Sequence, residues 1–510
     1  METVETEGRT DAHTQQPRLK RQLSVWEAIG VSLALMAPSM AANINPQAAA
    51  TTVGRAVPLT FALAAVGILL VSYTFVRLCQ RFNHSGSVYG FVGATLGART
   101  GVISGWALTG TYTFYGVVTS MAGGRFLADL LDTIGVWHNP PLWSGFLLGC
   151  IGLVVVWWLA TTPIRHGTRV VLVVETVTVL LILAVTATVM YKLVTHTAPG
   201  GLGVDWSVFS VPKGTGTSTL FLGVVFGFLS FAGFEAAATL GEEAKRPRKD
   251  IPRAILGVAI FGGCYFVIVT AVEAMGFGTG AAGVKAFVNS SSLLGQLGTS
   301  YLASWVGTLI TVGAMISAFS CALASAVGAS RLLYALGRDG VLFGWLGHIS
   351  SEVRTPTHST AGILLAMYLI IAITWFALGG TPFDLFAESG AIGTLILLVV
   401  YILAGIGMIK LVFFSGDRSV ARWQLVMIPL AGLVVLGYTL YRNIYPLPTG
   451  IAWWGPSVAL AWLVFGIVWI LSRPALAARA GRRLAESEGL MALSPEAARP
   501  AGQPGSLAEL

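Results

Sequence analysis

The chain has 510 residues, of which 55% are hydrophobic and 11% are charged, with a mean hydropathy of +0.76. This composition excludes an ordinary water-soluble protein and predicts an integral membrane protein in contact with lipid. The net charge of +8 does not indicate a nucleic-acid partner, because the basic residues lie between hydrophobic runs, where they set membrane orientation.

Several kinds of chemistry have no support in the sequence. The four cysteines and seven histidines are scattered without ligand spacing, so neither a disulfide framework nor a metal site is expected. No GxxxxGK[ST] motif is present, which argues against ATP-driven pumping, and no cofactor is expected. The first 22 residues are polar, so no cleaved signal peptide is expected.

Hydrophobic runs of about 20 residues, the length that crosses a bilayer core, recur along the chain. They predict twelve membrane spans at about 24–53, 56–78, 100–128, 142–162, 168–194, 218–240, 252–278, 301–330, 358–378, 385–411, 421–441 and 451–472. The predicted organisation is a cytoplasmic tail over 1–22, a core of ten spans over 23–415, two further spans over 416–472 and a second cytoplasmic tail over 473–510.

An even number of spans places both chain ends on one side of the membrane, and the basic residues indicate which side. Most of them fall on the side of the termini, whereas the opposite loops hold only Arg55, Arg125, Lys192, Lys213, Lys285 and Arg442. Positively charged loops stay in the cytoplasm, so both termini are expected there, in a protein of the cytoplasmic membrane.

The first span is predicted to be interrupted. Residues 29–40 read IGVSLALMAPSM, and a proline inside a helix removes a backbone hydrogen bond and costs about 3 kcal/mol. Two asparagines, Asn43 and Asn45, follow within the same stretch. We therefore expect a break at Met36-Ala37-Pro38-Ser39-Met40. The alternative is an ordinary proline kink that neighbouring helices satisfy.

A second break is predicted in the sixth span, at Phe231-Ala232-Gly233-Phe234-Glu235. Gly233 allows the backbone to leave helical geometry, which frees N–H and C=O groups to meet a ligand. Placing a carboxylate such as that of Glu235 at this depth in the membrane costs roughly 2.5–3.5 kcal/mol on insertion scales, so its presence indicates a functional role. The alternative is a continuous helix in which Glu235 is a structural hydrogen-bond partner.

The two breaks lie five spans apart, which indicates a binding site between inverted repeats made of spans 1–5 and 6–10. The expected fold is an all-α membrane protein with twelve transmembrane helices, a five-plus-five inverted repeat and discontinuous helices 1 and 6. Because half-helix N-termini suit carboxylates and free carbonyls suit ammonium groups, the pair of breaks fits an α-amino acid.

Three linkers carry further predictions. Residues 80–97 are expected to contain a short interfacial helix, and residues 330–340 have the apolar spacing of a surface helix. The highly charged segment 242–253 is expected to end the sixth span abruptly.

The sixth span and its exit resemble the signature of the amino acid–polyamine–organocation transporters. The matching residues are 231–235, 240–243, Pro247, Ile251-Pro252 and Ala254-Ile255, and weaker matches are 86–90 with Gly105-Trp106, 330–340, and Thr355-Pro356. The resemblance covers about residues 20–415. It implies alternating access around a substrate held between spans 1 and 6, with N–H groups of 36–40 on a carboxylate and with carbonyls and an aromatic gate from 231–235.

The sequence departs from this family in two places. The first break reads Ala37-Pro38-Ser39 where many members have Gly-Ser-Gly, and since Pro38 has no N–H, the carboxylate cradle loses a donor or shifts by one residue. Some proton-coupled members carry a lysine on span 5, whereas span 5 here carries Glu175. Glu175 is either a proton carrier or a structural acid near Arg165 and Arg169.

Span 8 offers Ser317, Ser320 and Ser325. These hydroxyls either complete a sodium site with carbonyls of span 1 or bond back to their own helix.

The sequence thus predicts a secondary active transporter, not an enzyme, for an amino acid or a related amine such as a polyamine, coupled to protons or acting as an exchanger. The alternatives are sodium-coupled symport of another small solute by the same fold, and, from a different class, an intramembrane enzyme or a channel. An enzyme needs several catalytic groups at one depth and a channel needs a polar pore lining, whereas these spans carry scattered single polar residues.

Overall fold

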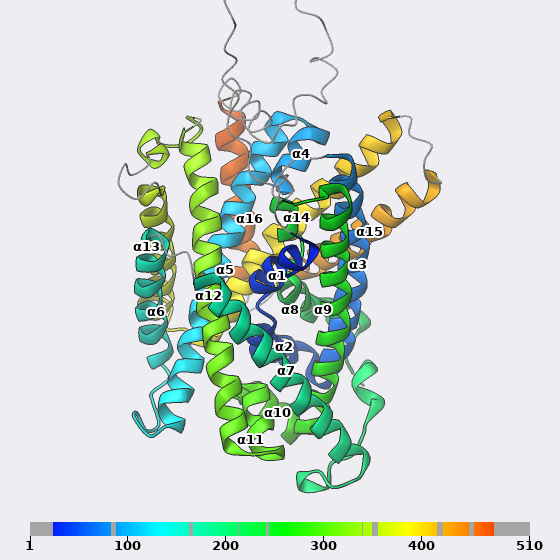
Figure 1. Ribbon diagram of the computed structural model, residues 1–510, viewed down its shortest axis with the longest axis vertical. Helices are drawn as coiled ribbons and strands as arrows, with labels where there is room; N and C mark the ends of the chain where they lie inside the picture. Colours follow the sequence, from blue (N-terminus) through cyan, green and yellow to red (C-terminus); the bar gives the residue numbers. More distant parts are fainter. Residues whose placement is uncertain are drawn as a thin grey trace, which may run out of the picture.

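The computed structural model describes residues 24–82, 88–162, 167–212, 214–240, 244–338, 340–348, 355–415, 422–447 and 453–473, and the elements of these residues are all helices (Figure 1). Ten stretches of the described residues are long and apolar enough to cross a membrane. The all-α membrane fold is confirmed at this level. The predicted tail over 1–22, and all of the tail over 473–510 beyond its first residue, lie outside the described residues.

Each predicted span contains at least one helix of the structure. The uninterrupted ones are α3 (Val57–Arg81), α5 (Ala98–Thr133), α6 (Ser144–Thr161), α7 (Gly167–Val194), α9 (Pro247–Phe277), α12 (Ser304–Arg338), α13 (Thr357–Ala372), α14 (Pro382–Ser415), α15 (Arg422–Ile444) and α16 (Trp454–Leu471). Exposed apolar side chains on α7, such as Val173, Val177 and Leu180, suit contact with lipid tails. The ten apolar stretches include 25–81 as a single stretch, although it contains two predicted spans. They do not include the 36-residue α5. The number of twelve spans therefore stays a prediction.

The first predicted span consists of α1 (Val25–Met36) and α2 (Pro38–Val53), separated by Ala37. Ala37 has a φ of 46°, in the left-handed region, and its N–H donates to the Leu33 carbonyl at 3.1 Å, as at a helix C-terminus. Pro38 occupies the first position of α2, where a missing N–H has no cost. The interruption is narrower than predicted, because Ser39 and Met40 already belong to the first turn of α2.

The sixth predicted span is also interrupted. The helix α8 (Leu220–Phe231) ends before Ala232, and a 3₁₀ segment, η5 (Ala236–Leu240), continues the chain. Between them Gly233 has a φ of 99°, which favours glycine, and a Cβ atom there would lie 2.9 Å from Cγ of Leu35 on α1. The two interruptions therefore approach each other closely.

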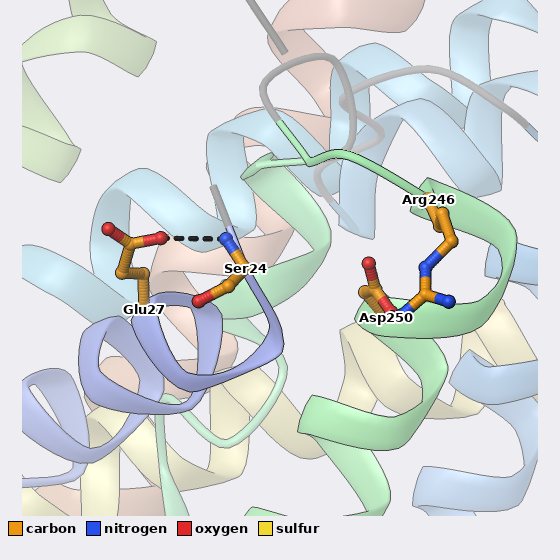
Figure 2. Close-up of polar contacts among 4 residues, drawn as sticks. All are labelled: Ser24, Glu27, Arg246 and Asp250. Atoms are coloured by element: carbon orange, nitrogen blue, oxygen red, sulfur yellow. Dashed lines mark hydrogen bonds and ion pairs between the residues drawn. The ribbon is translucent and has the colours of Figure 1, made fainter. Parts of the chain in front are cut away.

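The starts of α1 and α9 carry polar stabilisation that the sequence analysis left out (Figure 2). At α1, a capping box joins the N–H of Ser24 to the Glu27 carboxylate at 2.6 Å. At α9, Arg246 pairs with Asp250 of the first turn at 3.3 Å. The predicted start of span 7, at about residue 252, was too late, because a proline at the first position and an acid in the first turn begin the helix at Pro247.

Two predictions for linkers can be compared with the helices. The short helix expected within 80–97 is present as α4 (Val88–Leu96). The surface helix expected at 330–340 is not separate, because α12 runs without interruption from Ser304 to Arg338.

Two short helices were not predicted, α10 (Ala281–Asn289) and α11 (Leu293–Tyr301), which lie at the lower end of Figure 1. A buried side chain of α2 connects α11 to the broken helix: Asn43 Oδ1 accepts hydrogen bonds from the Ser292 hydroxyl at 2.8 Å and from the Leu294 N–H at 3.0 Å. The asparagine thereby satisfies a free donor at the start of α11.

The last helix, α16, is joined to α5 by a reciprocal pair of tryptophans. The rings of Trp106 and Trp462 stack with centroids 4.5 Å apart, and each indole N–H donates to the backbone carbonyl of the other residue, at 2.9 and 3.2 Å. Each ring also covers a glycine of the opposite helix, since a Cβ atom at Gly110 or at Gly466 would overlap the facing indole. We call these four residues the tryptophan clasp.

Candidate functional site

A narrow cavity lies between the two interruptions and the helices around them. The residues that line it come from α1, α2, α5, α8, α12, α14 and the segment after α8. They are Leu35, Met36, Met40, Asn45, Thr111, Tyr112, Tyr115, Val118, Thr119, Leu229, Ala232, Gly233, Glu235, Cys321, Ser325 and Leu397. The lining is mostly apolar with a few polar groups, which is typical of sites for small molecules.

The structure brings five of the ten residues proposed from sequence around this cavity, namely Met36, Met40, Ala232, Gly233 and Glu235. The residues Ala37, Pro38 and Ser39 are buried but are not part of the lining.

The two phenylalanines proposed for the site point into packed aromatic groups. The ring of Phe231 lies 5.3 Å from that of Phe266, and the ring of Phe234 lies 5.9 Å from that of Phe75. Neither phenylalanine contributes to the cavity lining.

Glu235 is the only acid among the residues that line the cavity. Its side chain is 6% exposed, and its Oε2 atom has no hydrogen-bond partner among the described residues. The backbone N–H groups of Gly233 and Glu235 and the hydroxyl of Tyr401 lie close to the carboxylate. The carboxylate therefore lies beside donors of the interrupted segment, and its Oε2 atom is an acceptor that a ligand can use.

Asn45 offers a second free acceptor. Its Nδ2 atom donates to the Ser230 hydroxyl at 2.7 Å, and that hydroxyl donates its own proton to the Phe226 carbonyl at 2.9 Å. Because the hydroxyl has one proton, it accepts from the Asn45 amide, which fixes the amide orientation. Oδ1 of Asn45 is consequently left buried without a partner among the described residues, on a side chain that lines the cavity.

The proposed coupling residue Glu175 lies on α7, outside the cavity lining. Its Oε1 atom accepts a hydrogen bond of 2.8 Å from the Ser39 N–H, in the first turn of α2. Helix N-termini attract negative charge, so the half-helix stabilises this carboxylate. The structure thus places Glu175 against the first break, whereas the side chains of Arg165 and Arg169 lie outside the described residues.

The serines proposed for span 8 lie on α12 at different places. Ser317 is buried, its hydroxyl has no hydrogen-bond partner among the described residues, and it lies beside Glu175. Ser320 is half-buried and does not line the cavity. Ser325 lines the cavity together with Cys321, whose thiol donates to the Leu35 carbonyl at the end of α1 at 3.3 Å.

Comparison with known proteins identifies the family. A family model described as "Amino acid permease" matches residues 23–470. The chain belongs to the amino acid permease family.

Named relatives differ in what they carry. This permease is 26% identical over 367 residues to the branched-chain amino acid permease BcaP of Bacillus subtilis, a match that covers 68% of this chain and 72% of the relative. It is 23% identical over 439 residues to the low-affinity putrescine importer PlaP of Escherichia coli K12, a match that covers 83% of this chain and 89% of that importer. It is 23% identical over 364 residues to the mitochondrial cationic amino acid transporter 3 of Arabidopsis thaliana, a match that covers 69% of this chain and 58% of that transporter.

One further buried acid of this permease was not predicted from the sequence to have a role. Glu273 on α9 is fully buried, and both of its carboxylate oxygens lack a hydrogen-bond partner among the described residues. It does not line the cavity. The signal that singled out Glu235, a lone carboxylate inside an apolar run, was equally present at Glu273.

Proposed function

We propose that this permease is a secondary active transporter that moves an amino acid or a related amine across the cytoplasmic membrane by alternating access. The observation that carries the proposal is the cavity between two interrupted helices, with unpaired acceptors on Glu235 and Asn45. Substrate sites at broken helices let backbone groups bind the cargo while the two halves of the protein rock around it.

The proposal includes the finer architecture. Counting the stretch 25–81 as two spans, α1 with α2 and then α3, and adding α5 to the ten apolar stretches supports twelve spans. The interruptions fall in the first and sixth of these, which favours a five-plus-five inverted repeat, and the even number with the charge asymmetry favours cytoplasmic termini. We propose that the protein transports its substrate and does not act on it as an enzyme, because the cavity lining contains a single carboxylate and no histidine.

For the driving ion we propose the proton, with Glu175 as its carrier. A carboxylate held by one N–H of the first break, beside a serine hydroxyl that has no partner among the residues described, can change its protonation together with the position of α2. One observation supports the sodium alternative: the Ser317 hydroxyl on α12 lies beside Glu175, which contacts the start of α2. Exchange without an ion remains the third form of the same activity.

The test is uptake of labelled amino acids and amines by proteoliposomes under an imposed proton gradient, an imposed sodium gradient, or neither. Saturable uptake that an inward proton gradient accelerates supports the proposal. Uptake that only sodium accelerates would transfer the coupling role to the sodium alternative, and turnover of substrate in detergent without membranes would contradict transport altogether.

Glu175→Gln gives the sharper prediction. The amide oxygen can still accept the Ser39 N–H, and the amide N–H₂ faces free hydroxyls, so folding is expected to persist. Since the amide cannot titrate, uptake is expected to continue down a substrate gradient and to lose its response to the proton gradient. A variant that still concentrates substrate in response to pH would remove Glu175 from the coupling mechanism.

A further inference from the structure

We propose that the substrate is an organic ammonium ion without a carboxylate, such as an alkyl monoamine or diamine, bound with its ammonium group between Glu235 and Asn45. This inference rests on the proposed transport function and narrows its substrate class. Three observations on the described residues lead to it.

The first observation concerns the start of α2, where a substrate carboxylate would be expected to bind. The first residue, Pro38, has no N–H, and the next N–H, of Ser39, already donates to Glu175. The N–H groups of Ala37 and Ala41 donate to the carbonyls of Leu33 and Ala37, so the Met40 N–H is the one donor of this turn without a hydrogen bond among the described residues. The protein's own carboxylate thus takes one of the two free donors of this turn, and a substrate carboxylate at the remaining Met40 N–H would be repelled by it in a low-dielectric interior.

The second observation concerns the free polar atoms of the cavity. The buried Oε2 of Glu235 and Oδ1 of Asn45 are both acceptors that find no partner in the described part of the chain. None of the sixteen lining residues is Lys, Arg or His, so the lining contains no side-chain cation that would pair with a carboxylate. An ammonium group supplies three donors and one positive charge, which matches two acceptors and one acid.

The third observation concerns the rest of the lining. Tyr112 and Tyr115 on α5 present aromatic rings, which attract cations through their faces. Met36, Met40 and Leu397 contribute flexible apolar surface, which suits a hydrocarbon chain. An amine with an apolar stem therefore finds complementary groups on all sides of the cavity.

The experiment uses pairs of compounds that differ only by a carboxylate, each offered to the full-length protein in proteoliposomes. The pairs are ornithine and putrescine, lysine and cadaverine, leucine and isoamylamine, and phenylalanine and phenethylamine. In the best pair the amine is expected to enter about tenfold faster or more, because a buried unpaired carboxylate loses at least as much binding energy as one hydrogen bond. The methyl ester of the same amino acid is the matched control for size, and it is expected to follow the amine.

Three outcomes are distinguishable. An amine preferred over its amino acid, with the ester behaving like the amine, supports the inference. An amino acid that enters as fast as its amine, or faster, overturns the inference and leaves the transport function intact. Absence of saturable flux for every compound overturns the proposed function, and the inference with it.

A pair of variants tests the first observation separately. Glu175→Ala removes both the charge and the acceptor from the Ser39 N–H and is expected to lower the amine-to-amino-acid uptake ratio about tenfold. Glu175→Gln keeps the acceptor and loses only the charge, so it is expected to lower the ratio less than Glu175→Ala does. This uptake ratio does not depend on proton coupling, because a variant that loses coupling loses it for the amine and for the amino acid alike. Thermal stabilisation of the purified variants by putrescine and by ornithine provides the same comparison without transport. An unchanged ratio in Glu175→Ala would contradict the role given to this carboxylate.

Discussion

Buried hydroxyls in this permease mostly donate to a carbonyl one turn earlier on their own helix, as Thr113 does to Thr109 and Ser120 does to Gly116. Glu235 and Asn45 instead keep buried acceptor oxygens without partners among the described residues. A buried acceptor that is left unpaired costs about 1–3 kcal/mol. A ligand that donates to these atoms recovers this free energy, so the two residues favour a bound amine.

Glu235→Gln tests this argument at a single side chain. The amide keeps the volume of the side chain but loses the charge, and a hydrogen bond to a charged group contributes about 1.5–3 kcal/mol. Transport efficiency is therefore expected to fall about ten- to a hundredfold while the melting temperature stays close to that of the parent. Uptake kinetics and thermal unfolding in detergent measure the two effects. Glu388→Gln on α14, a carboxyl outside the cavity lining, is the control and should transport normally. Equal effects of the two substitutions would make Glu235 a structural residue.

At the scale of the elements, the two interruptions depend on each other. Gly233 at the end of α8 lies against Leu35 at the end of α1, and a Cβ atom there would also lie 3.1 Å from the Leu35 carbonyl carbon. The backbone of one break therefore leaves room only for glycine in the other. Because both breaks line the same cavity, a displacement of either one changes the site.

Gly233→Ala should accordingly abolish most transport. A side chain at a φ of 99° is strained and also meets α1, so the two breaks must separate. We expect uptake to fall at least about tenfold, since a displacement of 1 Å in a binding site can cost a hundredfold. Gly257→Ala on α9, where a Cβ atom would meet nothing within 4 Å, is the matched control. Normal uptake by Gly233→Ala would mean that the contact between the breaks is not required.

The membrane helices were largely predictable because the length of a hydrophobic run can be read directly from the sequence. The two breaks were predictable because a proline and a glycine mark them. The left-handed backbone conformation of Ala37 was not predictable, because it follows from how α1 and α2 pack and not from the preference of alanine itself. The short helices α10 and α11 were missed because neither is long enough to span a membrane. Tyr112, Tyr115 and Cys321 face the cavity only through the rotation of α5 and α12, which a single sequence does not reveal. The rotation of α8 and the course of the segment after it direct Phe231 and Phe234 into the core.

The tryptophan clasp allows a prediction about how α16 is attached. Gly110→Ala places a methyl group where the Trp462 ring lies, so α16 must move away and both indole hydrogen bonds are weakened. Overpacking of this kind costs about 1–3 kcal/mol, and a lower melting temperature is expected in detergent. Gly437→Ala on α15, with no atom within 4 Å of the added carbon, should leave the melting temperature unchanged. A clasp variant as stable as this control would show that the helices hold together by other contacts.

At the scale of the whole molecule, the proposed orientation places α10 outside the cell and the end of α12 inside. Lys285 on α10 and Arg331 on α12 are both exposed and suit a cysteine substitution. Lys285→Cys is expected to react with a membrane-impermeant maleimide in intact cells, and Arg331→Cys only after permeabilisation, because the reagent cannot cross the bilayer. The parent protein, whose four cysteines lie in membrane-spanning helices, gives the background. Labelling of Arg331→Cys in intact cells would reverse the orientation.

The helix that the tryptophan clasp holds, α5, also forms one wall of the cavity, through Thr111, Tyr112 and Tyr115. Gly110, which the indole of Trp462 covers, directly precedes Thr111 in the chain. A displacement of α16 would thus be transmitted through the two stacked rings to the wall that faces the cargo.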